Sequence, residues 1–386
     1  MSKQSILVAG AGIGGLTAAL TLWQRGFHVT VVEQASDLKP LGVGINLLPH
    51  AVRELDELGL GDRLTSISVA PRAISYYDNH GSELFREPRG IEGGYGHPQL
   101  SVHRGRLQML LLDAVADRLG DDTVQTAARL TGFTDADGGI VGHTAAGDMR
   151  ADALVGADGV NSTVRAALHP EDGPLLWSGI RMFRGAARRQ AFLDGHTMAI
   201  VKGVGGVDLV VYPIGAGLVN WVLQVPGGQP GPLTGDAAWN RAADPAEIIP
   251  LVEHWRLGWL DVAGLIGNTD AVFEYPMVDR DPLTGWGPLN GSGRATLLGD
   301  AAHPMYPVGA NGGSQAILDA RVLADELAHG VENGLRRYEE RRRPETAEVV
   351  EANREMLHAG AGRRPDQLAR VTAKYRSDTH ADRTHA

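Results

Sequence analysis

The chain contains no cysteine among its 386 residues, which excludes disulfide frameworks, thiolate nucleophiles, iron–sulfur clusters and Cys-ligated zinc. No apolar run reaches the ~18 residues of a membrane-spanning helix. Basic residues are also outnumbered, 36 against 46 acidic ones, whereas a general nucleic-acid binder needs the opposite balance. The apolar stretch 6–22 is interrupted by glycines, unlike a signal peptide. We therefore expect a cytoplasmic protein without nucleic-acid or membrane partners.

Glycine, by contrast, is abundant, with 51 residues against a usual share of ~7%. The glycines gather where strands are expected to turn into helices. Residues 5–9 form a short apolar run typical of a buried parallel strand. A helix is predicted over 16–25 and a second strand over 28–33, which together make a βαβ unit. Further helices are predicted at about 49–58 and 104–119.

The pattern changes to β-rich between about residues 177 and 275. Strands are predicted over 197–201, 207–212 and 218–225, separated by glycine turns, and we expect them to form an antiparallel sheet. A parallel-type strand returns at 294–298, followed by a helix over about 314–328. A long polar helix is predicted over about 335–357, with Pro344 kinking or splitting it.

The glycine turn after the first strand has the spacing Gly10-x-Gly12-x-x-Gly15, with Gly14 inside it. This spacing allows a tight turn, a close approach of backbone to a pyrophosphate and close helix–strand packing. Glu33, followed by Gln34, closes the second strand, where an acid accepts hydrogen bonds from a ribose. The carboxylate disfavours a 2′-phosphate, so the turn predicts a site for NAD or FAD.

Two further motifs follow predicted strands: Asp158-Gly159, and Gly299-Asp300 with Pro307 and Gly309 before a helix. With the glycine turn, they resemble the three-part fingerprint of FAD-dependent aromatic monooxygenases of the para-hydroxybenzoate hydroxylase type. Segments 40–46, 103–111, 275–282 and 305–311 resemble in particular the phenazine hydroxylase subfamily, which acts on 5-methylphenazine-1-carboxylate.

The resemblance implies a role for each matching position. Asp300 would hold a ribityl hydroxyl, Arg104 would reach the FAD ribose and pyrophosphate, and Val43 would lie in a mobile loop beside the isoalloxazine. The backbone of Leu130, in an edge strand, would lie near the adenine, and Asp158 would serve both FAD and NAD(P)H. The amides that would face the flavin N1–O2 edge belong to Gly309, Ala310, Asn311, Gly312 and Gly313.

The chemistry implied by the resemblance is carried by the cofactor. FAD would be bound non-covalently, NAD(P)H would reduce it transiently, and O2 would form a flavin C4a-hydroperoxide that hydroxylates an electron-rich aromatic or phenazine-like small molecule. We therefore expect no catalytic side chain and no metal. A flavin oxidase, dehydrogenase or epoxidase on the same scaffold is the alternative, and a non-enzymatic flavin-binding sensor is a third. The candidate substrate-contacting residues are Met182, Arg184, Tyr212, Trp221 and Met305.

The fold class that follows is α/β, with a Rossmann-like FAD-binding domain, an interleaved β-rich substrate domain and C-terminal helices. The FAD-binding domain is assigned to 1–70, 101–175 and 290–330, and the substrate domain to 71–100 and 176–289. Residues 331–361 form a C-terminal helical segment, and 362–386 form a polar tail expected to be disordered. A monomer or a homodimer is expected.

Overall fold

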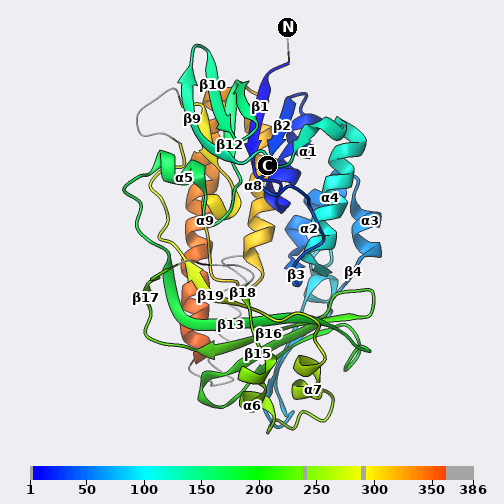
Figure 1. Ribbon diagram of the computed structural model, residues 1–386. Helices are drawn as coiled ribbons and strands as arrows, with labels where there is room; N and C mark the ends of the chain where they lie inside the picture. The colour runs from blue at the N-terminus through cyan, green and yellow to red at the C-terminus, as the bar shows by residue number, and fades with distance from the viewer. Residues whose placement is uncertain (1–2, 236, 238–240, 288–292, 362–386) are drawn as a thin grey trace.

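The computed structural model describes residues 3–235, 237, 241–287 and 293–361, so the expected polar tail lies outside the described residues. Its upper part in Figure 1 is built on a parallel sheet of five strands in the order β20-β12-β1-β2-β8. Their apolar residues suit a sheet that is covered on both faces. The bounds are Ser5–Ala9 (β1), His28–Val32 (β2), Val124–Gln125 (β8), Ala153–Gly156 (β12) and Ala295–Leu297 (β20).

Helices cover one face of this sheet, and a small antiparallel sheet covers the other. The main helices are α1 (Ile13–Gln24), α4 (Arg104–Leu119) and α8 (Asn311–Leu327). The small sheet has the order β11-β10-β9, with bounds Leu130–Ala136 (β9), Gly139–Thr144 (β10) and Gly147–Ala151 (β11). Leu130 therefore does begin an edge strand, while the expected contact of its backbone with adenine stays a prediction.

A second, nine-stranded sheet crosses the lower part of the molecule (Figure 1). Its order is β18-β19-β13-β16-β15-β14-β5-β6, with β17 paired to β13. The bounds are Ala73–Asp78 (β5), Glu83–Pro88 (β6), Leu176–Arg188 (β13), Thr197–Lys202 (β14), Asp208–Pro213 (β15), Leu218–Pro226 (β16), Gly231–Pro232 (β17), Arg241–Ala242 (β18) and Phe273–Asp279 (β19).

The expected antiparallel pairing of the strands between residues 197 and 226 is confirmed, since β14 pairs with β15 and β15 with β16 in antiparallel register. The sheet also contains a parallel pair that the sequence did not predict. β14 pairs in parallel with β5, because β5 comes from an earlier part of the chain and joins the sheet beside the later hairpins. Local periodicity reports which residues are extended, but it carries no information on a pairing across more than a hundred residues. The assignment of 71–100 and 176–289 to one substrate domain stays a prediction.

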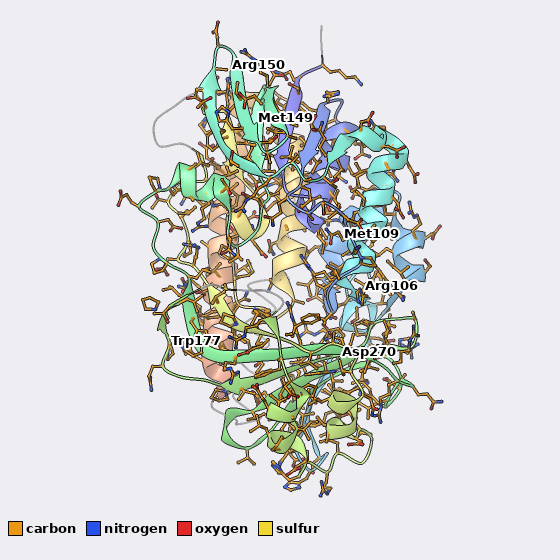
Figure 2. All side chains as sticks on the ribbon, viewed as in Figure 1. Arg106, Met109, Met149, Arg150, Trp177 and Asp270 are labelled. Atoms are coloured by element: carbon orange, nitrogen blue, oxygen red, sulfur yellow. The ribbon has the colours of Figure 1, made fainter. Side chains whose placement is uncertain are left out.

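The nine-stranded sheet presents two different faces because side chains alternate along each strand. One face packs on α6 (Ile249–Val252) and α7 (Val262–Gly267). In Figure 2, Trp177 lies near one end of β13, and Asp270, which follows α7, lies across the sheet from it. The opposite face turns toward α8 and the five-stranded sheet. The space between the two sheets is therefore lined by residues of both.

A three-stranded sheet in the order β3-β7-β4 links the two halves. Its strands and the short helices have the bounds Gly44–Leu47 (β3), Ser68–Val69 (β4), Leu100–His103 (β7), Pro49–Glu57 (α2), Gly61–Ser66 (α3) and Thr163–Leu168 (α5). None of the helices in the described part of the chain is both long and apolar enough to span a bilayer.

The C-terminal helix α9 runs from Val331 to Ala361 along one side of the molecule, from the five-stranded to the nine-stranded sheet (Figure 1). Pro344 does not split this helix, while a kink at Pro344 stays a prediction. Contacts on the preceding turns hold it, since the Tyr338 hydroxyl donates to the Leu297 carbonyl (3.0 Å) and the Arg342 guanidinium donates to Asp319 (2.8 Å). The ring of Pro344 is exposed, so the free-energy cost of a proline inside the helix is limited to the helix backbone.

Candidate functional site

In the first turn, Gly10 and Gly15 are needed for close packing, whereas Gly12 lies beside open space. A Cβ added to Gly10 would lie 2.4 Å from the Ala157 carbonyl oxygen, and one added to Gly15 would lie 2.0 Å from the Gly10 oxygen. Both glycines are therefore required by the packing itself. A Cβ added to Gly12 would meet no atom within 4 Å, and Gly12 caps α1 without a side-chain hydrogen bond. The amides at the N-terminus of α1 are therefore accessible from the open space beside Gly12.

Glu33 is fixed directly after β2, beside this turn. Its Oε2 accepts a hydrogen bond from the Ala11 amide (2.8 Å), and its Oε1 accepts one from the Ala35 amide (2.9 Å). A carboxylate has about four lone-pair sites, so each oxygen keeps acceptor capacity for the hydroxyls of a ribose. Gln34 is exposed beside it.

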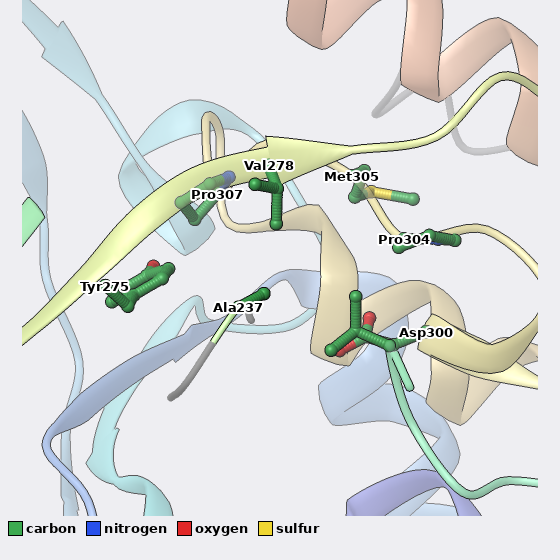
Figure 3. A pocket seen from close by; sticks show the side chains of 8 residues that line it. Ala237, Tyr275, Val278, Asp300, Pro304, Met305 and Pro307 are labelled. Atoms are coloured by element: carbon green, nitrogen blue, oxygen red, sulfur yellow. The ribbon is translucent and has the colours of Figure 1, made fainter. Parts of the chain in front are cut away.

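Asp300 lines the cavity between the two sheets. Figure 3 shows it across from Tyr275 and Val278 of β19. Burial raises the pKa of its carboxyl, while the charges of His303 and Arg104 lower it. In the described part of the chain no group donates a hydrogen bond to the Asp300 carboxylate, so its acceptor capacity is directed at the cavity. The cavity lining also includes Val160, Ala237, Pro304, Met305 and Pro307.

The segment that leads into α8 lines the same cavity through Pro304, Met305 and Pro307. Gly309 (φ +70°) and Ala310 (φ +66°) are left-handed, and Ala310 caps α8 without a side-chain hydrogen bond. The helix begins at Asn311, three residues earlier than predicted, because the turn closes sharply at these two residues. The amides of Asn311, Gly312 and Gly313 form its first turn, and a Cβ on Gly312 would lie 3.7 Å from Asp300 Oδ1. The helix N-terminus and Asp300 therefore share one wall.

A buried ion cluster supports Asp300 from behind. The Asp319 carboxylate accepts hydrogen bonds from the Gly299 amide (3.0 Å) and Arg342 Nε (2.8 Å) and pairs with His303 Nε2 (2.6 Å). Burial would raise the pKa of Asp319, but the charges of His303 and Arg342 outweigh it and lower the pKa to about 2. His303 Nε2 is thus bound to Asp319 and not directed at the cavity.

The other predicted FAD residues lie around this core. Arg104 begins α4 and is exposed, and its amide donates to the Val43 carbonyl (2.8 Å), while the Val43 side chain is buried. The Asp158 carboxylate accepts hydrogen bonds from the Ser162 hydroxyl and the Thr163 amide (2.7 Å), so it caps α5. These bonds give Asp158 a local role, and its contact with FAD and NAD(P)H stays a prediction.

Four of the five predicted substrate residues lie on the cavity side of the nine-stranded sheet or opposite it. Met182 packs with Met277 and Tyr306, and Met305 lines the cavity. The Arg184 guanidinium lies over the Tyr275 ring at 4.2 Å from its centroid. The fourth, Tyr212, is buried and pairs with Asn220 across β15 and β16, on the same face as Arg184.

The prediction for Trp221 is wrong. Trp221 pairs with Gly185 rather than with Arg184 or Met182, so its side chain points to the opposite face of the sheet. There it is fully buried against α7, and its indole Nε1 donates to the Thr269 hydroxyl (2.9 Å). A shift of one residue along a strand decides between core and pocket, and a pattern of apolar residues cannot fix that choice.

Sequence reasoning missed Tyr275 and Asn220. Tyr275 pairs with Met182 across β13 and β19 and lies between Arg184 and Asp300. Burial raises its pKa, which the positive charge of Arg184 opposes. Asn220 accepts a hydrogen bond from the Gly44 amide (2.6 Å) and so ties the 40–44 loop to the sheet. Tyr275 opens one of the segments behind the family resemblance, and the parity of β19 is the signal that identifies it.

Comparison with known proteins identifies the class. The family model described as an FAD-binding domain matches residues 3–177 and 290–353, and the chain belongs to this family. The residues fit the cofactor: an open helix N-terminus at Gly12, the Glu33 carboxylate held beside it and Asp300 facing the cavity. The protein is a flavin-dependent monooxygenase that uses FAD with NAD(P)H as reductant, and the resemblance to the aromatic monooxygenases is confirmed.

Individual relatives cover nearly the whole chain. A phenazine 1,6-dicarboxylic acid hydroxylase of Lysobacter antibioticus is 45% identical, covering 100% of this chain and 98% of the relative. A 3-amino-4-hydroxybenzoate 2-monooxygenase of Streptomyces platensis is 35% identical over 92% of this chain and 88% of the relative. The fold resembles that of Klebsiella pneumoniae HpxO, crystallised with FAD and uric acid, with a TM-score of 0.78 at 24% identity, covering 98% of this chain and 93% of that one. The expected α/β fold class is thereby confirmed.

The two classes of glycine in the first turn give a direct test of the FAD site. Gly12→Ala places a methyl group in open space, so the protein should keep its thermal stability but bind FAD at least about tenfold more weakly. Gly15→Ala, the matched change, should lower thermal stability because its Cβ overlaps the Gly10 carbonyl. Fluorescence titration with FAD and thermal unfolding of the apoprotein measure the two effects. Normal FAD affinity in Gly12→Ala would contradict the phosphate assignment.

The buried ion cluster predicts a pH-dependent stability. Because the pKa of Asp319 is lower in the folded protein, its contribution is complete above about pH 4 and is lost as the pH falls toward about 2. Asp319→Asn should therefore cost roughly 3–5 kcal/mol at pH 7, and the difference from the wild type should shrink below pH 4. Denaturant unfolding across this range measures it.

The matched control is Asp325→Asn on the same helix, whose partner Arg25 is exposed. Exposed ion pairs contribute about 0–1 kcal/mol, so this variant should remain close to the wild type at every pH. A constant difference between wild type and Asp319→Asn down to pH 2 would show that the carboxylate charge is not what stabilises the cluster.

Proposed function

We propose that the protein hydroxylates a fused, nitrogen-containing aromatic carboxylate of the phenazine type. The observation that carries this proposal is the Arg184 guanidinium, which lies over the Tyr275 ring beside the cavity that holds Asp300. A planar guanidinium binds a carboxylate with two parallel hydrogen bonds. The relatives named above act on phenazine 1,6-dicarboxylic acid and on an aminohydroxybenzoate, both aromatic carboxylates.

The surroundings of Arg184 suit a flat anionic substrate. Burial lowers the pKa of Arg184, while Tyr275 and Tyr212 oppose that effect. A carboxylate brought against the guanidinium favours its charged form. Aromatic rings pack against Tyr275 in offset or tilted geometry, and Met182 and Met305 adapt to the outline of a bound ring system. The pocket thus combines one charge-specific contact with adaptable apolar walls.

Bound FAD supplies the oxygen-transfer chemistry once NAD(P)H has reduced it, with one atom of O2 entering the substrate and the other leaving as water. The side chains position the substrate and exclude water. Burial raises the pKa of both Tyr212 and Tyr275, so their hydroxyls stay protonated at neutral pH and can donate to a substrate heteroatom. The amides at the start of α8, beside Asp300, would stabilise negative charge that develops on bound FAD.

The relatives favour hydroxylation over an oxidase, dehydrogenase or epoxidase reaction and over a flavin-binding sensor. A direct experiment uses the purified FAD-loaded protein with NADH or NADPH and isotopically labelled O2. Phenazine-1-carboxylate and phenazine-1,6-dicarboxylate should accelerate NAD(P)H consumption and yield a product that contains one labelled oxygen. The number of carboxyl groups left on the product shows whether hydroxylation removes one. Peroxide that accounts for all the O2 consumed would contradict the proposal.

Replacing Arg184 tests how the substrate is recognised. Arg184→Gln should raise the KM for phenazine-1-carboxylate at least about tenfold, since charge-assisted hydrogen bonds contribute about 1.5–3 kcal/mol. The KM for the neutral phenazine-1-carboxamide should change little. Arg188→Gln, an exposed arginine on the same strand, is the matched control and should behave as the wild type. An equal loss for the acid and the amide would mean that Arg184 does not bind the carboxylate.

The expectations of a monomer or homodimer and of a cytoplasmic location stay predictions. The small-molecule substrate and O2 are the partners that the proposed reaction requires.

A further inference from the structure

We propose that Asn353 of α9 is a positioning residue that clamps the turn 306–311 into the shape that presents its amides to the flavin. Asn353 is fully buried. Its Nδ2 donates to the Tyr306 carbonyl (3.1 Å), and its Oδ1 accepts from Asn311 Nδ2 (3.3 Å). One side chain thus bridges the first and last residues of the turn. This inference concerns the FAD site and does not depend on the identity of the substrate.

The turn needs such a clamp because its backbone is strained. Gly309 and Ala310 are both left-handed, with φ of +70° and +66°. Glycine adopts this conformation without penalty, but a residue with a Cβ is strained in it and holds it only when the surroundings impose it. Tyr306 and Asn311 lie on either side of the strained residues. Bonds at both ends therefore oppose relaxation of Ala310 toward a right-handed conformation.

Neighbouring contacts hold α9 itself against the turn. Arg354, next along the helix, pairs with Asp279 of β19 at 2.7 and 3.1 Å. Burial and the charge of Asp279 raise the Tyr306 pKa to about 12. Val349 and Val350 pack on Met305, just before the turn. The Tyr306 backbone is thus bound to α9, and its side chain packs in a cluster that includes Leu357 of α9.

The position of the turn determines what the clamp controls. The segment leads into the first turn of α8, whose amides have no partner within the helix. Amides held in place stabilise negative charge better than amides that must reorganise first. FAD gains negative charge on reduction, so a loosened turn should weaken binding of reduced FAD more than binding of oxidised FAD.

The experiment compares Asn353→Leu with the wild type. Leucine has a similar size but makes neither hydrogen bond. The ratio of affinities for reduced and oxidised FAD, obtained from the midpoint potential of bound against free FAD, should fall by about tenfold. Oxidised FAD should still bind, because Glu33, Gly12 and Asp300 are unchanged. Asn353→Thr can keep one of the two bonds, so it should give an intermediate shift and serves if Asn353→Leu fails to fold.

The matched control is Thr346→Val, which removes another buried hydrogen bond on α9, from the Thr346 hydroxyl to the Arg342 carbonyl (3.0 Å). It should lower thermal stability without changing the affinity ratio. Ala310→Gly, which relieves the strain, should reduce the effect of Asn353→Leu when the two are combined. An unchanged ratio in Asn353→Leu and Asn353→Thr, or an equal shift in Thr346→Val, would overturn the proposal. Neither result bears on the phenazine substrate, which is tested separately.

Discussion

The Asp319 carboxylate is the interaction on which the cavity depends. It is fully buried, and it binds the Gly299 amide, His303 and Arg342 at once. Gly299 and His303 lie in the segment after β20, Arg342 lies on α9 and Asp319 itself lies on α8, so the cluster joins three parts of the chain. A buried charge that lost one partner would be strongly penalised, so the three elements are held in one arrangement. Asp300 follows Gly299 directly. The hydrogen bond from the Gly299 amide to Asp319, which lies on the side away from the cavity, therefore sets the orientation of Asp300 toward the cavity.

The proposed FAD site would meet an anionic cofactor mainly with backbone rather than with charge. The chain carries a net charge of −10, and Glu33 beside the first glycine turn and Asp300 beside the cavity add negative charge to the proposed site. The compensating groups would be the helix N-termini at Gly12 and Asn311 and the guanidinium of Arg104. Helix termini supply partial positive charge at fixed positions and lose no side-chain entropy on binding. Close packing at Gly10 and Gly15 fixes the first of these termini beside Glu33.

The predictable part of the fold is the part encoded locally. Strand β1 and helix α4 occur over the predicted residues, and the motifs around Gly12, Glu33 and Asp300 could be placed because each follows a strand within a few residues. Features that depend on contacts between residues far apart in the sequence could not be predicted. The parallel pairing of β14 with β5, the position of Trp221 on the face that packs against α7 and the cavity position of Tyr275 depend on sheet register. The unbroken course of α9 through Pro344 depends on contacts that Tyr338 and Arg342 make elsewhere.

Helix α9 connects the two halves of the reaction site. Through Asn353 it touches the turn before α8, and through Arg354 it touches β19, the strand that carries Tyr275. Tyr306 lies at this junction, since its carbonyl accepts a hydrogen bond from Asn353 and its side chain packs with Met277 of β19. A displacement of β19 by a substrate that contacts Tyr275 would therefore act on the same helix that holds the turn before α8. The contacts of Asn353, Arg354 and Tyr306 thus join the strand that carries Tyr275 to the segment that enters α8.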